Sequence, residues 1–234
     1  RIERNIQGKA RNIRYELLSK YCLDKKINAI LTAHNLEDQV ETFFIRLSRG
    51  SGLTGLSAMK VESKLTRNIF LLRPLLNTKK NLLIKITKNV FGKYFKDPTN
   101  NNTNYLRTKI RSLKKSLSKS GIHYDQIFKS INNLASSQAT LDRYLKETCK
   151  QTLVKKKGLS VINLKKFDTL NSEVKMQLIN ISIKNLKNNY YNLRSKKVLN
   201  LIENIKKKGF VKSTLGGCLF IKNGDKLSVK IEKN

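Results

Sequence analysis

Residues 29–42 read AILTAHNLEDQVET and join a short strand to the start of a helix. The apolar run Ala29–Ala33 predicts a β-strand, which stops at His34. Asn35 is a favourable N-cap residue, and the acidic residues after it are typical of a first helical turn. Because open α/β sheets bind ligands where strands end and helices begin, this stretch predicts a ligand site in an α/β fold.

The predicted helix carries polar side chains on one face. Asp38, Glu41 and Thr42 are spaced i, i+3 and i+4, which places them side by side. Two carboxylates, an amide and the His34 imidazole gathered here indicate a site. The spacing alone leaves a second interpretation open, because the helix dipole favours acidic residues in a first turn and a histidine at a strand end is often only a loop residue.

Several blocks of sequence resemble the tRNA(Ile)-lysidine synthetase family, whose members are N-type ATP pyrophosphatases of the PP-loop superfamily. The blocks follow the family's order and run along nearly the whole chain. They are residues 10–15 (ARNIRY), 33–42 (AHNLEDQVET) with Arg46, 49–56 (RGSGLTGL), 72–76 (LRPLL), 97–100 (DPTN), 105–111 (YLRTKIR) and 214–218 (TLGGC).

The chain departs from the family pattern in a few places. Asn35 stands where a second histidine is frequent, Glu37 where aspartate is frequent, and Thr108 where asparagine is common. The family's nucleotide loop, Ser-Gly-Gly-x-Asp-Ser, is not found in these residues, and the chain opens on Arg1. We therefore expect the C-terminal part of a longer protein. Since that loop cradles pyrophosphate, these residues alone are expected to bind ATP poorly and to catalyse little.

The resemblance implies an ATP-dependent ligase. In the family, the C2 carbonyl oxygen of the wobble cytidine in tRNA(Ile) with a CAU anticodon is adenylated, and free L-lysine then displaces AMP to form lysidine. ATP is the implied co-substrate, with Mg²⁺ expected, and tRNA(Ile) and lysine are the implied partners. The resemblance places Asp38 and Glu41 at the ammonium groups of lysine and His34 near the nucleotide, as the candidate catalytic residues.

Basic side chains supply candidates for phosphate contacts, because the arginine fork suits phosphate. The nucleotide candidates are Arg11, Arg14, Arg46, Arg49 and Arg73. The tRNA candidates are Arg107, Arg111, Lys155, Lys156, Lys157, Lys206, Lys207 and Lys208. A solvated basic face is the alternative for Arg11, Arg14, Arg46 and Arg49. The resemblance implies that the region of Arg107 and Arg111 shapes the site or grips tRNA, and a salt bridge to Asp97 is the alternative for Arg107. Tyr190 and Tyr191 are candidates for base stacking or for the core.

The composition favours an RNA partner. The chain has 49 Lys+Arg against 16 Asp+Glu, a formal net charge of +33, although an AT-rich genome also enriches lysine. No apolar run approaches the roughly 20 residues of a membrane span, and no membrane partner is expected. Cys22, Cys149 and Cys218 form no Cys-x-x-Cys pair, so no metal site is predicted and reduced thiols in the cytoplasm are expected.

The pattern of elements predicts three segments. Residues 1–120 alternate helix and strand, typical of a parallel sheet, and form a partial Rossmann-like PP-loop domain whose first strands are missing. Residues 121–194 read as a helical tRNA-binding region, with one short extended piece near Val161. Residues 195–234 read as a small β-containing module that ends in a hairpin at Asn223-Gly224.

Two other functions remain open. A related PP-loop enzyme, a tRNA thiolase, needs paired cysteines that the sequence does not have. A non-catalytic basic RNA-binding fragment needs no acidic pocket, so Asp38 and Glu41 argue against it for a whole protein. Whether the protein forms a homodimer is also left open.

Overall fold

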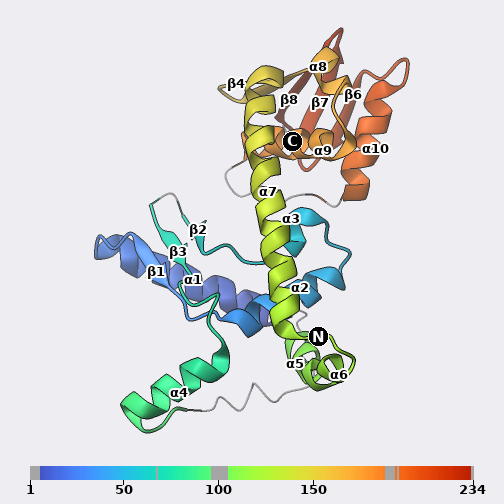
Figure 1. Cartoon of the computed structure of the whole chain (residues 1–234). Helices are drawn as coiled ribbons and strands as arrows, with labels where there is room; N and C mark the ends of the chain where they lie inside the picture. The colour runs from blue at the N-terminus through green and yellow to red at the C-terminus, as the bar shows by residue number, and fades with distance from the viewer. Residues whose placement is uncertain (1–5, 67, 96–104, 188–192, 194, 233–234) are drawn as a thin grey trace. The chain divides into compact units, whose positions relative to one another are not determined.

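The computed structural model describes residues 6–66, 68–95, 105–187, 193 and 195–232 (Figure 1). The chain divides into two compact units, Arg1–Gln138 and Ala139–Asn234. Helix α7 (Tyr124–Thr152) contributes residues to both units. The finer division into segments 1–120, 121–194 and 195–234 stays a prediction. No helix in the described part of the chain is long and apolar enough to cross a membrane.

The first unit contains a small mixed sheet with strand order β1-β3-β2. Strands β1 (Ala29–Leu31) and β3 (Phe70–Leu72) run parallel, with Leu31 opposite Leu72. Their parallel pairing agrees with the expected sheet type. Strand β2 (Glu62–Lys64) is antiparallel to β3 and was not predicted, because its sequence ESK has no apolar residue to mark a buried face.

The helices of this unit follow the order that the sequence predicts, with two differences: a short helix lies at Leu53–Leu56, where the sequence predicts a glycine-rich loop, and the helix predicted over 105–119 is broken. The helices are α1 (Ile6–Asp24), α2 (Leu36–Leu47), the short α3 (Leu53–Leu56), α4 (Lys80–Phe91), α5 (Leu106–Ser112) and α6 (Lys114–Lys119). The sequence predicts one helix over 105–119, whereas the structure ends α5 and begins α6 at Leu113. There the Leu113 backbone N–H donates to Ile110 three residues back, a tighter turn than the α-helix makes.

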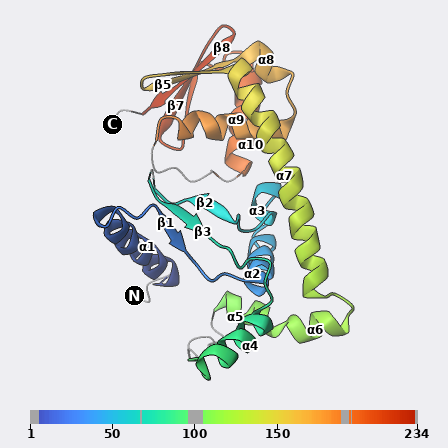
Figure 2. The ribbon, with the colours of Figure 1, turned by 60° about the vertical axis from the view of Figure 1, so that its left-hand side comes forward.

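Two apolar clusters position the first unit's elements. Cys22 of α1 packs with Ile30 of β1 and Leu71 of β3, and Figure 2 shows α1 lying along the sheet. In the second cluster, Val40 of α2 is fully buried and packs with Ile131 of α7. This second cluster fixes the start of α7 against the acidic helix α2.

The second unit is an antiparallel sheet of five strands packed on helices. The strand order is β4-β5-β8-β7-β6, with β4 (Leu153–Lys156), β5 (Leu159–Asn163), β6 (Lys212–Leu215), β7 (Cys218–Asn223) and β8 (Lys226–Ile231). Helices α8 (Leu164–Asp168), α9 (Ser172–Lys184) and α10 (Ser195–Lys206) complete the unit.

Strand pairing in the second unit joins residues that the sequence predicts to lie in two separate segments. Asn223 pairs with Lys226, so the predicted hairpin is confirmed. Strand β5 pairs with β8, however, so residues 153–163 and the C-terminal strands form one sheet. Strand β4 was not predicted: it follows α7 directly and, among the described strands, pairs only with the neighbouring β5.

Candidate active site

Two strand ends meet at the edge of the first unit's sheet. Because β1 and β3 are parallel, the residues that follow them emerge together, and Thr32 N–H donates to Leu72 C=O at 2.9 Å. Beyond these strands lie His34 and Arg73. The His34 Nδ1 is 2.8 Å from Thr32 Oγ1, which holds the imidazole at this edge. The strand ends, where the sequence predicts a ligand site, therefore carry the imidazole of His34 and the guanidinium of Arg73.

Helix α2 begins with a reciprocal cap. The backbone N–H of Asp38 donates to Asn35 Oδ1 at 3.1 Å, and the backbone N–H of Asn35 donates to Asp38 Oδ2 at 3.0 Å. Such a capping box satisfies two backbone donors that the helix leaves unpaired. The predicted N-cap role of Asn35 is confirmed, and one carboxylate oxygen of Asp38 is engaged in the cap.

Glu41 lies in the interior and is held by two arginines of α5. Its side chain is only 2% exposed. Arg111 donates from Nε to Oε1 at 2.7 Å and from Nη2 to Oε2 at 3.1 Å, and Arg107 Nε lies 3.0 Å from Oε2 without an aligned hydrogen bond. A buried carboxylate needs such compensation, since desolvating an unpaired charge is costly. This hydrogen bond to Glu41 raises the pKa of Arg111.

The same contacts locate the two arginines proposed to bind tRNA. Arg107 also donates from Nη2 to Thr42 Oγ1 at 3.3 Å and lies 3.9 Å from Asp38 Oδ1. The structure therefore brings Arg107 and Arg111 to the acidic face of α2. Asp97, the alternative partner of Arg107, is outside the described residues.

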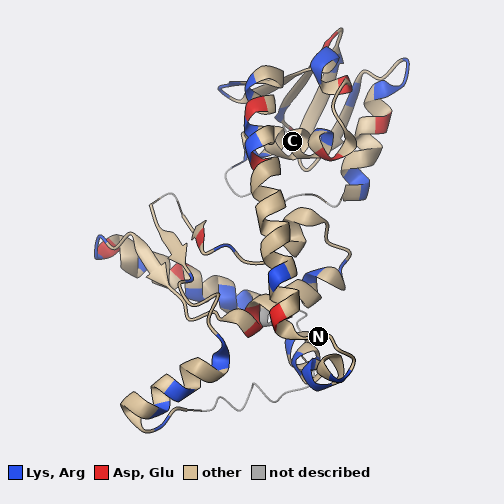
Figure 3. Ribbon diagram, in the orientation of Figure 1, with Lys and Arg blue, Asp and Glu red and all other residues tan. Residues whose placement is uncertain are grey.

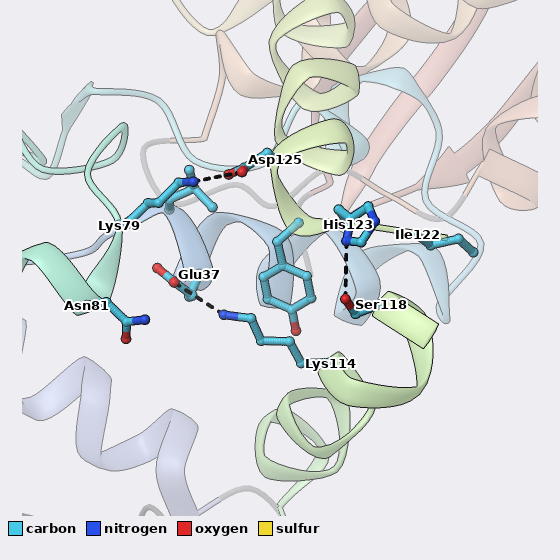
Figure 4. A pocket seen from close by; sticks show the side chains of 10 residues that line it. Glu37, Lys79, Asn81, Lys114, Ser118, Ile122, His123 and Asp125 are labelled. Atoms are coloured by element: carbon cyan, nitrogen blue, oxygen red, sulfur yellow. Dashed lines mark hydrogen bonds and ion pairs between the residues drawn. The ribbon is translucent and has the colours of Figure 1, made fainter. Parts of the chain in front are cut away.

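A small hollow opens on this acidic face. It has a volume of about 110 Å³ and is lined by the carboxylates of Glu37, Asp38 and Glu41 and by cationic side chains. A larger neighbouring hollow of about 240 Å³, drawn in Figure 4, shares Glu37 and Lys114. Glu37 Oε2 accepts from the backbone N–H of Lys80 at the start of α4. The hollow thus carries both charge signs, as a zwitterionic ligand requires.

Two of the predicted phosphate-binding arginines lie near His34. Burial lowers the pKa of His34, Asp38 opposes that shift, and the positive charges of Arg73, Arg11 and Arg107 add to it. Arg73 is buried, and its Nη1 donates to Lys60 C=O and Ser63 Oγ, while its buried Nε has no hydrogen-bond partner among the described residues. This part of the sheet edge therefore concentrates positive charge beside a neutral imidazole.

The other predicted phosphate ligands have different surroundings. Arg46 Nη1 donates to the carbonyls of Gly55 and Ala58, both at 2.7 Å, and so fastens the glycine-rich loop to α2. Arg49 is exposed just beyond the far end of α2, about 16 Å along the helix direction from Asp38. Arg14 is exposed on α1, one turn from Arg11. The structure does not bring Arg46 and Arg49 to the acidic hollow.

The lysine clusters predicted to contact tRNA belong to the second unit. Lys155, Lys156 and Lys157 lie on the β4–β5 hairpin, and Lys206, Lys207 and Lys208 lie at the end of α10. All six side chains are exposed, and Figure 3 shows where basic residues lie on the ribbon. Tyr190 and Tyr191 are outside the described residues.

The lowered pKa of His34 predicts a pH effect on stability. Below pH 6.5 the unfolded chain protonates this histidine while the folded chain does not, so stability falls as the pH drops through this window. Replacing His34 with Asn should reduce the loss of stability between pH 7.5 and 5.5. Urea unfolding at both pH values measures it, with the exposed His123→Asn as the control. An undiminished pH effect in His34→Asn contradicts the prediction.

Comparison with known proteins shows the family to which this chain belongs. A family model described as a PP-loop domain matches residues 1–117, half of the chain. The chain therefore belongs to the PP-loop family, and the resemblance inferred from the sequence blocks is confirmed. It is 32% identical over 230 residues to the tRNA(Ile)-lysidine synthase of Wolbachia pipientis wMel, covering 97% of this chain and 53% of that protein.

Other relatives carry the same name. The tRNA(Ile)-lysidine synthase of Rickettsia felis is 31% identical, covering 92% of this chain and 50% of that protein. Among solved structures, a U34-tRNA thiolase, NcsA from Methanococcus maripaludis, matches at 19% identity and a TM-score of 0.46 over 58% of this chain and 45% of that one. The chain spans about half the length of the lysidine synthases that it matches along most of its own length.

Proposed function

We propose that the chain contributes the amino-acid pocket of an ATP-dependent ligase that joins lysine to the wobble cytidine of tRNA(Ile). The observation that carries the proposal is the hollow lined by Glu37, Asp38 and Glu41 beside the basic edge of the sheet. Carboxylates suit the two ammonium groups of lysine, because charge-assisted hydrogen bonds are roughly twice as strong as neutral ones. The similarity to tRNA(Ile)-lysidine synthases over 97% of the chain supports this choice of substrate.

The proposed reaction has two steps. The C2 oxygen of cytidine is a poor leaving group, so it is first converted to an adenylate, with release of pyrophosphate. The amine of lysine then attacks C2 and AMP leaves. An attacking amine must lose a proton, and a neutral imidazole near the carboxylates can accept it. Burial keeps the pKa of His34 low, so His34 is our candidate for that base.

The basic sheet edge fits the phosphates of a nucleotide. Arg73 has a buried Nε without a hydrogen-bond partner in the part of the chain described, and Arg11 is exposed on α1 close enough for its charge to act on His34. These two arginines would hold phosphate oxygens. Among the described residues, no group of three or more His, Cys, Asp or Glu side chains is arranged to hold a metal ion. Magnesium therefore stays an expectation.

The lysine proposal predicts the effect of one conservative substitution. Asp38→Asn keeps an oxygen that can accept from the Asn35 backbone N–H, so the cap survives while the charge is lost. We expect lysine affinity to fall about tenfold, because a hydrogen bond to a charged group contributes roughly 1.5–3 kcal/mol. Isothermal titration of the chain with L-lysine measures it. Asp24→Asn, at the exposed end of α1, is the matched control. Equal affinity of Asp38→Asn and the unsubstituted chain would remove Asp38 from the site.

Ligase activity is tested separately. The DNA upstream of the Arg1 codon is sequenced first, and the chain is expressed together with any open reading frame that continues into it. Incorporation of labelled lysine into a tRNA(Ile) transcript with a CAU anticodon, dependent on ATP, supports the ligase, and the same transcript with a changed anticodon is the control. No incorporation by any expressed frame contradicts it.

The second candidate function is RNA binding without catalysis. The exposed lysines of the second unit and the net charge of +33 favour it as a description of this chain alone. Lysine titration separates the two candidates, since an RNA-binding module needs no affinity for a free amino acid.

A further inference from the structure

One buried hydroxyl in the first unit has no hydrogen-bond partner among the residues that the structure describes. Tyr124 begins α7 and is 8% exposed, and its Oη is buried without a partner in the described residues. Its ring belongs to the apolar cluster of Leu36 and Val40, which explains the burial of the ring but not of the hydroxyl. Leaving a buried polar group unpaired is costly, and phenylalanine would fill the same cluster without that cost. The hydroxyl therefore indicates a partner that is not among the described residues, as a bound ligand would be.

Tyr124 belongs to the lining of the acidic hollow. It lines the hollow together with Arg111 and Lys114, and Lys114 Nζ lies 4.8 Å from the centre of its ring. Burial and the nearby Glu41 raise the pKa of Tyr124, so the hydroxyl stays protonated at neutral pH and can donate. Tyr124, the Arg111 guanidinium and the Lys114 ammonium group thus line the same hollow as the carboxylates of Glu37, Asp38 and Glu41.

This distribution of charge fits an amino acid in one orientation. Arg111 uses Nε and Nη2 for Glu41, which leaves Nη1 outside these two bonds. Lys114 is only loosely paired, at 3.5 Å from Glu37. These donors suit a carboxylate, whereas the Asp38 carboxylate suits an ammonium group.

We propose that the Tyr124 hydroxyl donates a hydrogen bond to the α-carboxylate of the bound amino acid, beside Arg111 and Lys114. The proposal rests on the lysine pocket proposed above and adds to it the group that selects an amino acid over a simple diamine. A site built to hydrogen-bond one group discriminates strongly against analogues without it, because its buried polar atom is then left unpaired.

The test compares two ligands on the whole chain. Isothermal titration is done with L-lysine and with cadaverine, which is lysine without its carboxylate. Tyr124→Phe is expected to lower lysine affinity about tenfold and to leave cadaverine affinity unchanged. Its melting temperature without ligand should be no lower than that of the unsubstituted chain, since the hydroxyl has no partner to lose in the described part of the chain. Tyr144→Phe removes an exposed hydroxyl from the same helix and is the matched control.

The possible results separate this inference from the function it rests on. Unchanged lysine affinity in Tyr124→Phe overturns the role of the hydroxyl and leaves the lysine pocket standing. An equal loss for lysine and cadaverine places the hydroxyl at an ammonium group and overturns the carboxylate assignment. A lowered melting temperature without ligand identifies a structural hydroxyl and also overturns it. Failure of the unsubstituted chain to bind lysine overturns the pocket itself, and the inference with it.

Discussion

Glu41→Gln is expected to lower the free energy of unfolding of the first unit by about 3 kcal/mol, because it leaves two guanidinium groups without their shared carboxylate. The Glu41 side chain is 2% exposed and lies 2.7 Å from Arg111 Nε and 3.0 Å from Arg107 Nε. Both arginines are about one-third exposed, at 33% and 37%, so water screens them in part and the loss should fall at the lower end for buried pairs.

The measurement needs a probe that reports on the first unit. The chain has no tryptophan, so hydrogen exchange of the α2 amides during urea titration is suitable. Glu16→Gln removes an exposed carboxylate from α1 and is the matched control. Adding Arg111→Gln to Glu41→Gln should recover part of the loss, since it removes one unpaired cation. A loss below about 1 kcal/mol would mean that the pair carries the energetics of a surface salt bridge.

The contacts of Glu41 with the two arginines also affect the proposed binding of lysine. A carboxylate engaged by two arginines has less capacity for a lysine ammonium group than Asp38, whose remaining oxygen lies 3.9 Å from the nearest arginine nitrogen. If Glu41→Gln weakens lysine binding, the first explanation to test is displacement of Arg111 from the hollow. Lysine affinity that falls in step with the loss of stability would indicate that displacement.

The start of the site could be predicted from sequence because its determinants are local. The strand at Ala29, the cap at Asn35 and the shared face of Asp38 and Glu41 all follow from residues within a few positions of one another. Their register depends on backbone geometry that the neighbouring residues set. The family blocks added the chemical interpretation.

The partners of these residues could not be predicted in the same way. Arg111 and Arg107 lie 70 and 66 positions after Glu41, and their pairing with this carboxylate was not predicted. Tyr124 is also distant in sequence and resembles any core tyrosine. Arg46 looked like a phosphate ligand, but its partners are loop carbonyls. Long-range pairing decides these roles, and a single sequence carries no local signal for it.

The exposed lysines of the second unit predict a large effect of substitution on RNA affinity. Replacing Lys155, Lys156 and Lys157 with glutamine is expected to weaken tRNA binding more than tenfold near physiological salt. Each lysine that neutralises a phosphate releases a counterion, so the slope of log K against log salt should become shallower by about 2–3. Fluorescence anisotropy of a labelled tRNA transcript across a series of KCl concentrations measures both quantities.

The control for this substitution must remove the same charge elsewhere. Glutamine at Lys20, Lys25 and Lys26, all exposed around the end of α1, also lowers the net charge by three. If both triple variants weaken binding equally, the affinity comes from net charge and the β4–β5 hairpin has no special role. If only the hairpin variant loses affinity, the phosphates contact that surface. The same experiment with Lys206, Lys207 and Lys208 decides whether the end of α10 shares it, because two surfaces on one RNA should add their slopes.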